Sequence, residues 1–250
     1  MNIALLGYGK MGKAIEEIAL QKGHQIVLRI DDQNLEELTK ENLRKADVAI
    51  EFTGPDSAVS NILLCFDAGI PVVCGTTGWL SQMNTVKQKC EEINASFLYA
   101  SNFSIGVNIF FELNKKLAML MKQQPNYDVS IEEIHHTGKK DAPSGTAITL
   151  AEQIITASAE KNKWALRQAQ DGKGIRQVQD DKASNELVIT SKRIDPFAGT
   201  HSVKYTSGID DIEIIHTAHN RKGFAVGALL AAEFIHDKKG IYSMKDVLDF

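Results

Sequence analysis

The chain has 250 residues, 43% of them hydrophobic and 24% charged, which is the balance of an ordinary globular protein with a buried core. A net charge of −4 without a long basic run argues against nucleic-acid binding. No apolar run approaches the roughly 20 residues of a membrane span, and "MNIALLGYGK" lacks the features of a secretion signal. Cys65, Cys74 and Cys90 match neither a zinc spacing nor a disulfide framework. We therefore expect buried thiols in a cytoplasmic protein that contacts no membrane.

A glycine-rich turn follows the first apolar segment. "NIALLG" (residues 2–7) is typical of a buried parallel strand, and Gly7, Gly9 and Gly12 then stand at G-x-G-x-x-G spacing before a helical pattern. The first glycine permits a tight turn, the second lets the backbone approach a pyrophosphate, and the third lets helix and strand pack closely. The helix N-terminus offers N–H groups to the phosphates. We predict dinucleotide binding; a purely structural glycine turn is the alternative.

A second strand over residues 24–30 ends in Asp31, about 20 residues after the glycines, where a carboxylate bonds the adenosine ribose hydroxyls. Asp32 follows, and a carboxylate pair would repel the 2′-phosphate of NADPH. Lys10 and Arg29 could offset that repulsion. The expected cofactor is therefore NADH or NADPH, with the preference open.

Strands and helices continue to alternate up to residue 103. Apolar strands at residues 46–53, 71–78 and 95–103 are separated by helical patterns, which predicts an α/β, Rossmann-type doubly wound parallel sheet. Ligands bind at the carboxyl ends of such strands. Two polar turns at these ends suit the ribose and nicotinamide, although a capped turn is the alternative for either alone: Gly75, Thr76 and Thr77, and Ala100, Ser101, Asn102 and Phe103.

The pattern changes after Phe103. A long helix over residues 104–124, with Ile109, Phe110, Leu113, Leu117 and Leu120 as its core stripe, precedes strands near residues 127–136, 186–194, 201–207 and 211–219. These predict a second α+β domain with an open mixed or antiparallel sheet. The polar stretch 160–185 is predicted to be a surface loop or flap, and the final apolar helix to pack on the first domain. The domains are then 1–104 plus 220–250 for the dinucleotide, and 105–219 for substrate binding and oligomerisation through an exposed sheet face.

The segment "EEIHHTGKKDAPSGTA" (residues 132–147) concentrates positive and proton-carrying groups in a mildly acidic chain. A strand ends in His135 and His136, Lys139 and Lys140 follow, and Ser144 is the expected N-cap of a helix. Such a segment can hold an anionic dicarboxylate, leaving one imidazole, with little pKa adjustment, for proton transfer. Zinc is the rival ligand, but adjacent histidines on a strand face opposite ways and no third ligand stands at useful spacing. We predict no metal.

These residues resemble the dihydrodipicolinate reductase (4-hydroxy-tetrahydrodipicolinate reductase) family. The likeness covers nearly the whole chain through "GYGKMG", "EFTGP", "GTTGW", "ASNFSIGVN", "EEIHHTGKKDAPSGTA" and "HTAHNRKGFAVGALLAA". One departure is Asp32, where some members carry a phosphate-binding Arg. The resemblance implies NAD(P)H-dependent reduction of a cyclic dicarboxylate in the diaminopimelate route of lysine biosynthesis, by a homotetramer.

The resemblance also implies roles for individual residues. His135 and Lys139 match the catalytic proton donors, and Lys140 falls at a variable place. Substrate binding falls to His136, Gly145 and Thr146. The cofactor site comprises Gly7, Tyr8, Gly9, Lys10, Met11, Gly12, Asp31, Gly75, Thr76, Thr77, Ala100, Ser101, Asn102, Phe103 and, near the domain junction, Arg221. Two alternatives remain: another two-domain dehydrogenase, and a catalytically idle nucleotide sensor on the same fold.

Overall fold

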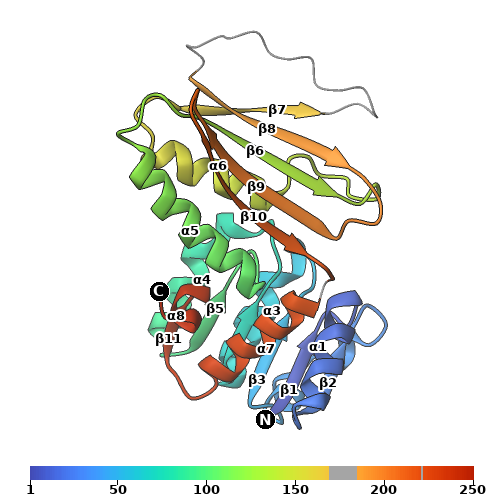
Figure 1. Ribbon diagram of the computed structural model, residues 1–250. Helices are drawn as coiled ribbons and strands as arrows, with labels where there is room; N and C mark the ends of the chain where they lie inside the picture. The colour runs from blue at the N-terminus through green and yellow to red at the C-terminus, as the bar shows by residue number, and fades with distance from the viewer. Residues whose placement is uncertain (169–184, 221) are drawn as a thin grey trace. The chain divides into compact units, whose positions relative to one another are not determined.

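The computed structural model describes residues 1–168, 185–220 and 222–250 (Figure 1). The chain forms two compact units. The first contains Met1–Ile105 and Lys222–Phe250, and the second contains Gly106–Arg221. The predicted limits, 1–104 with 220–250, differ from the first unit by one and two residues. The predicted loop over 160–185 lies mostly outside the described residues.

The first unit is built on a six-stranded sheet in the order β11-β5-β4-β3-β1-β2, parallel throughout. Its strands are β1 (Asn2–Leu6), β2 (Gln25–Ile30), β3 (Val48–Glu51), β4 (Val72–Cys74), β5 (Ser96–Tyr99) and β11 (Gly240–Tyr242). This arrangement confirms the predicted doubly wound fold. The three-residue edge strand β11 is too short for a periodic signal and was not predicted.

Helices cover both faces of this sheet, because side chains of a strand alternate between the faces. Ile3 and Leu5 of β1 pack with α1 (Lys10–Gln21) and α7 (Lys222–Ile235), whereas Ala4 and Leu6 pack with α3 (Pro55–Ala68) and α4 (Met83–Glu92). The predicted packing of the final helix on the first domain is therefore confirmed. Cys65, Cys74 and Cys90 are buried thiols, as expected. Short elements complete the unit: η1 (Leu35–Glu37), α2 (Lys40–Leu43), η2 (Leu80–Gln82) and α8 (Met244–Leu248).

The second unit carries a five-stranded mixed sheet in the order β10-β9-β6-β8-β7 (Figure 1). Its strands are β6 (Asp128–His135), β7 (Lys163–Gln168), β8 (Glu186–Arg193), β9 (Gly199–Thr206) and β10 (Asp211–Ala218). β8 is parallel to β6 and β7, and β9 is antiparallel to β6 and β10. The predicted open mixed sheet is confirmed. The prediction of a loop from residue 160 was wrong for residues 163–168. This segment, "KWALRQ", forms the edge strand β7, which pairs with β8.

Helices α5 (Ile105–Met121) and α6 (Gly145–Ala157) bury apolar side chains against one face of this sheet. The stripe predicted for α5 was wrong in part. Phe110 is buried, but Ile109, Leu113 and Leu120 are 45%, 53% and 66% exposed. The buried face instead runs through Val107, Phe110, Asn114 and Ala118. No helix in the described part of the chain has the length and apolarity to cross a membrane.

Candidate active site

The glycine loop between β1 and α1 depends on close backbone packing. Gly7 has φ of +93°, and a Cβ there would lie 2.0 Å from the Phe52 carbonyl oxygen. A Cβ on Gly12 would lie 2.7 Å from the Gly7 carbonyl oxygen. Both positions therefore require glycine, as the sequence pattern indicates. Gly9 forms the N-cap of α1, so the helix N-terminus points out of this loop.

A pocket of about 450 Å³ lies at this loop, entirely within the first unit. It brings together seven residues predicted to bind the cofactor: Gly7, Gly9, Lys10, Met11, Gly75, Thr76 and Thr77. Phe52, Thr53 and Pro55 complete it, although they were not predicted as site residues. These three follow β3, whose carboxyl end lies between those of β1 and β4. They lie in the "EFTGP" motif, one of the segments that resemble the family, and this motif could have identified them as site residues.

A buried polar network includes two residues that line this pocket, Thr53 and Thr76. Glu51 at the end of β3 is fully buried, and its carboxylate accepts hydrogen bonds from the Thr53 hydroxyl and, at 2.9 Å, from the Cys74 thiol. The Thr53 N–H donates to the Thr76 hydroxyl at 2.9 Å. Burial and the neighbouring Glu51 carboxylate raise the pKa of the Cys74 thiol, so it stays protonated. The turns after β3 and β4 are thereby held in register with each other.

The other predicted cofactor residues that the structure describes do not line this pocket. Asp31 directly follows β2, and its carboxylate accepts the Gln33 N–H at 2.9 Å. Residues 100–103 follow β5; the Asn102 side chain accepts the Ser104 N–H, and the Phe103 ring lies 5.6 Å from that of Phe52. Tyr8 lies in the glycine loop itself. Arg221 lies outside the described residues.

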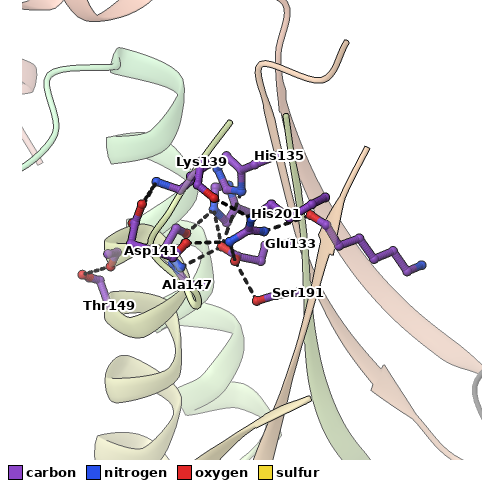
Figure 2. Close-up of polar contacts among 12 residues, drawn as sticks. Glu133, His135, Lys139, Asp141, Ala147, Thr149, Ser191 and His201 are labelled. Carbon is purple, nitrogen blue, oxygen red and sulfur yellow. Dashed lines mark hydrogen bonds and ion pairs between the residues drawn. The ribbon is translucent and has the colours of Figure 1, made fainter. Parts of the chain in front are cut away.

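The second unit contains a cluster of buried ionisable groups at the end of β6 (Figure 2). Val129, Ile131, Glu133 and His135 share the helix-covered face of the strand because side chains alternate. Val129 and Ile131 belong to the hydrophobic core. Glu133 and His135 are also buried on this face, but they carry a carboxylate and an imidazole. The sheet register places Glu133 directly opposite Ser191 of β8 and His201 of β9.

Glu133 is fully buried and surrounded by donors. Its carboxylate accepts hydrogen bonds from the Ser191 hydroxyl (2.7 Å), the Ser144 N–H (3.0 Å) and the Arg193 guanidinium (3.2 Å). Burial by itself would raise its pKa. His201, Ser144 and Ser191 outweigh burial and hold the pKa of this carboxyl well below its usual range. Glu133 is therefore a fixed negative charge inside the second unit.

His135 lies beside this carboxylate with its Nδ1 atom 3.6 Å from Glu133. Its ring centre is 5.0 Å from that of His201. Burial, and then repulsion from His201, lowers the pKa of His135 to about 4 despite the Glu133 charge. This value corrects the expectation that His135 needs little adjustment: the imidazole is neutral at pH 7. Desolvation depends on tertiary packing and has no signature in the local sequence.

The loop after β6 presents the remaining predicted residues. The Lys139 ammonium forms an ion pair with Asp141 at 2.8 Å, and Arg193 fastens the loop by donating to the Asp141 carbonyl at 2.6 Å. His136 is half-buried, and its carbonyl accepts the Lys139 N–H at 3.1 Å. Lys139 is 23% exposed at its side chain, whereas Lys140 is exposed.

Helix α6 begins immediately after this loop. Ser144 is its N-cap, and the hydroxyl accepts the Ala147 N–H at 3.2 Å, which confirms the predicted cap. The same hydroxyl lies 2.9 Å from His201 Nε2. Gly145 and Thr146 are the first two helical residues, so their backbone N–H groups belong to the positive end of the helix. The structure thus brings the loop, the helix N-terminus and the Glu133 cluster together.

The prediction that no third metal ligand stands at useful spacing was wrong. Ligand atoms of Glu133, His135 and His201 all lie within 4.8 Å of one another. However, the Glu133 oxygens already accept hydrogen bonds from two serine donors, and the Arg193 cation at 3.2 Å would repel a metal ion. These contacts count against a metal ion at the Glu133 carboxylate.

Glu133, Ser191, Arg193 and His201 were missed as members of this site. Their positions in strands with alternating buried residues offered a weak signal. Nothing in a single sequence gave the strand register that brings them together.

A parallel dinucleotide-type sheet, with an inserted mixed-sheet unit carrying imidazoles, a lysine and a helix N-terminus, defines a two-domain oxidoreductase dependent on NAD(P)H. The family described as dihydrodipicolinate reductase, N-terminus, matches residues 1–103, and its C-terminus counterpart matches residues 106–248. The chain belongs to the dihydrodipicolinate reductase family, which confirms the predicted family and enzyme class.

Named relatives match along their full length. A 4-hydroxy-tetrahydrodipicolinate reductase of Christiangramia forsetii is 49% identical over 250 residues, covering 99% of this chain and 98% of the relative. Another, of Methanosarcina barkeri, is 34% identical and covers 99% of each chain. A solved dipicolinate-bound dihydrodipicolinate reductase from Paenisporosarcina sp. TG-14 superimposes with a TM-score of 0.74 at 22% identity, covering 98% of each chain. At that identity the superposition establishes the shared fold.

Proposed function

We propose that the chain is a 4-hydroxy-tetrahydrodipicolinate reductase, forming tetrahydrodipicolinate with NADH or NADPH in the diaminopimelate route of L-lysine biosynthesis. Its full-length likeness to reductases of that name carries the proposal. The reduced nicotinamide supplies a hydride to an unsaturated carbon of a cyclic dicarboxylate. The chain must bind the two carboxylates, position the ring and provide a proton.

The loop and helix that follow β6 supply the proposed carboxylate site. Backbone N–H groups of Gly145 and Thr146 suit one carboxylate at the positive helix end. Lys139 forms an ion pair with Asp141. A substrate carboxylate can take the place of the Asp141 carboxylate in this pair. The half-buried His136 lies next to this loop and is the further substrate contact.

Two groups are proposed to transfer protons. The Lys139 ammonium, which forms an ion pair with Asp141, both balances a substrate carboxylate and donates a proton. His135 is neutral before substrate binds, and an arriving dianion stabilises its protonated form, which raises its pKa toward the working pH. Glu133 does not contact the substrate in this mechanism. Its carboxylate accepts the Ser144 N–H and lies 3.7 Å from His201 Nε2, and these contacts fix the position of the neighbouring His135 side chain.

The pocket at the glycine loop is the proposed pyrophosphate and ribose site of the cofactor. It joins Gly7, Gly9 and Lys10 at the start of α1 to Thr76 and Thr77 after β4. Asp31 is proposed for the adenosine ribose, and residues 100–103 for the nicotinamide end, since they follow the neighbouring strand β5. The remaining predicted contacts, Tyr8, Met11, Gly12 and Gly75, belong to the same two turns.

A homotetramer built on the second unit is also proposed. The edge strand β10 exposes apolar side chains, with Ile212 at 38% and Ile215 at 59%, whereas the inner strands β6, β8 and β9 bury alternate side chains. Burying such side chains between copies of the chain is favourable. Light scattering should give four times the chain mass of 27.6 kDa. A monomer in solution would remove this part of the proposal.

The activity test is oxidation of NADH or NADPH on adding the product of the preceding synthase, with dipicolinate as inhibitor. His135→Ala and Lys139→Ala should each lower kcat by about 10²–10⁴-fold, the usual range for a positioned acid–base group, and leave the Kd of NADH nearly unchanged. Lys140→Ala is the matched control, because Lys140 is an exposed neighbour in the same loop. Near-normal turnover in both first variants would reject their catalytic roles.

A further inference from the structure

The glycine loop is attached to the end of β2. The N–H groups of Gly7 and Tyr8 both donate to the carbonyl of Ile30, at 2.9 and 2.8 Å. Ile30 is the last residue of β2, and Asp31 and Asp32 come next. In dinucleotide-binding folds the acidic residue at this point bonds the adenosine ribose, and a basic residue nearby accommodates the 2′-phosphate of NADPH. The charges around this strand end therefore bear on the choice of nucleotide.

Arg29 is the basic side chain that precedes the two aspartates, and its guanidinium is already engaged. Its Nε atom donates to the Glu16 carboxylate at 3.0 Å, Nη2 donates to the same carboxylate, and Nη1 donates to the Ile26 carbonyl at 3.3 Å. The guanidinium carbon lies 5.9 Å from the centre of the Tyr8 ring. The Nε and Nη2 nitrogens both donate to one oxygen, Oε1 of Glu16, so the contact is a charge-assisted hydrogen-bonded ion pair.

Glu16 is held from two sides. Besides Arg29, the Tyr8 hydroxyl donates to its carboxylate, and the Glu16 side chain is only 13% exposed. The hydrogen bond from Arg29 lowers the pKa of Glu16, so the carboxylate is ionised at pH 7. The Arg29 side chain is 42% exposed, so a 2′-phosphate can approach it, but the Glu16 carboxylate already balances its positive charge and repels the phosphate.

The remaining charges do not favour a phosphate. Lys13 lies 5.8 Å from the centre of the Tyr8 ring and adds one positive charge. Counting Lys13 and Arg29 against Glu16, Asp31 and Asp32, the group carries two formal positive charges and three negative ones. Lys10 lines the pocket of the glycine loop with Thr76 and Thr77, at the proposed pyrophosphate site.

We propose that the chain selects NADH over NADPH, because Glu16 and Tyr8 engage the one arginine of β2 beside a ribose site lined by Asp31 and Asp32. This inference rests on the proposed function, since it assumes that the first unit binds a reduced nicotinamide dinucleotide. Glu16 and Arg29 are specificity-determining residues in this reading. Neither needs to touch NADH.

The test measures Kd for NADH and for NADPH on the full chain by isothermal titration calorimetry. The wild-type protein should bind NADH at least about tenfold more tightly than NADPH, as expected where carboxylates face a 2′-phosphate. Glu16→Gln frees Arg29 and should lower the Kd of NADPH by about 3–10-fold, with less than about a twofold change for NADH. Asp32→Ala, an exposed substitution that does not disturb the Arg29 contacts, should shift the ratio in the same direction.

Glu17→Gln is the matched control, because Glu17 neighbours Glu16 on α1 but pairs with Lys222 instead. It should leave both Kd values unchanged. Equal or tighter binding of NADPH by the wild-type protein would overturn the inference while leaving the proposed function intact. An equal effect of Glu16→Gln on both nucleotides would overturn the role of Arg29. Binding of neither nucleotide would instead refute the proposed function, and the inference with it.

Discussion

The buried imidazole of His135 should make the second unit sensitive to pH in a defined window. Its pKa is about 4 in the folded protein against an ordinary value of 6.5, because burial disfavours the charged form. Unfolding exposes the ring, which then takes up a proton at any pH below about 6.5. The contribution of the neutral His135 to the free energy of unfolding is therefore fully present above pH 6.5, and it is lost as the pH falls toward 4.

The size of this effect follows from the difference between the two pKa values. At about 1.4 kcal/mol for each pH unit, it reaches about 3 kcal/mol once the pH is below 4, and about 2 kcal/mol at pH 5. His135→Asn removes the titrating group and keeps a small polar side chain. Between pH 7 and pH 5, the wild-type free energy of unfolding should fall by about 2 kcal/mol more than that of the variant.

Urea unfolding at the two pH values measures this difference. Trp164 of β7 lies in the same sheet, so its fluorescence, in a Trp79→Phe background, reports on the second unit alone. Any packing lost in His135→Asn cancels, because each protein is compared with itself at the other pH. Equal losses for the two proteins would show that His135 is not held neutral by burial, and would refute the reasoning.

Two further substitutions test the packing on which the sites depend. Glu133→Ala leaves Arg193 without its buried partner and should reduce the free energy of unfolding by about 3–5 kcal/mol, with Glu133→Gln costing less because it keeps an acceptor oxygen. Urea unfolding followed through Trp164 measures both, and equal losses would show that the acceptor oxygen kept by Glu133→Gln contributes nothing, which would contradict the expected ranking. Gly227→Ala places a Cβ 1.7 Å from the Phe103 carbonyl oxygen in the first unit, so it should cost about 3 kcal/mol, the upper end of the usual range for overpacking, and weaken NADH binding. A normal melting temperature for Gly227→Ala would contradict that contact.

Local sequence predicts the features that depend on neighbouring residues. The glycine loop was predictable because its G-x-G-x-x-G spacing is a local pattern and buried parallel strands give apolar runs, although the contact that requires Gly7 is with the distant Phe52. His135, His136 and Lys139 were found together because a single loop carries them. The cap at Ser144 was equally local.

The remainder depends on tertiary contacts. Glu133 meets Ser191 and His201 only through the register of β6 with β8 and β9, more than fifty residues away along the chain. The engagement of Arg29 by Glu16 likewise requires α1 to lie along β2. On α5 the apolar pattern admitted more than one face, and packing against the sheet selected that of Phe110.

The most direct test of the proposed function combines one substrate and one inhibitor. Reduced nicotinamide absorbance should decay when the purified chain and NADH meet freshly formed 4-hydroxy-tetrahydrodipicolinate, and the decay should slow in proportion to added dipicolinate. Persistence of the absorbance with both nucleotides, in a preparation shown by calorimetry to bind NADH, would contradict the assignment of this chain as a reductase of that substrate.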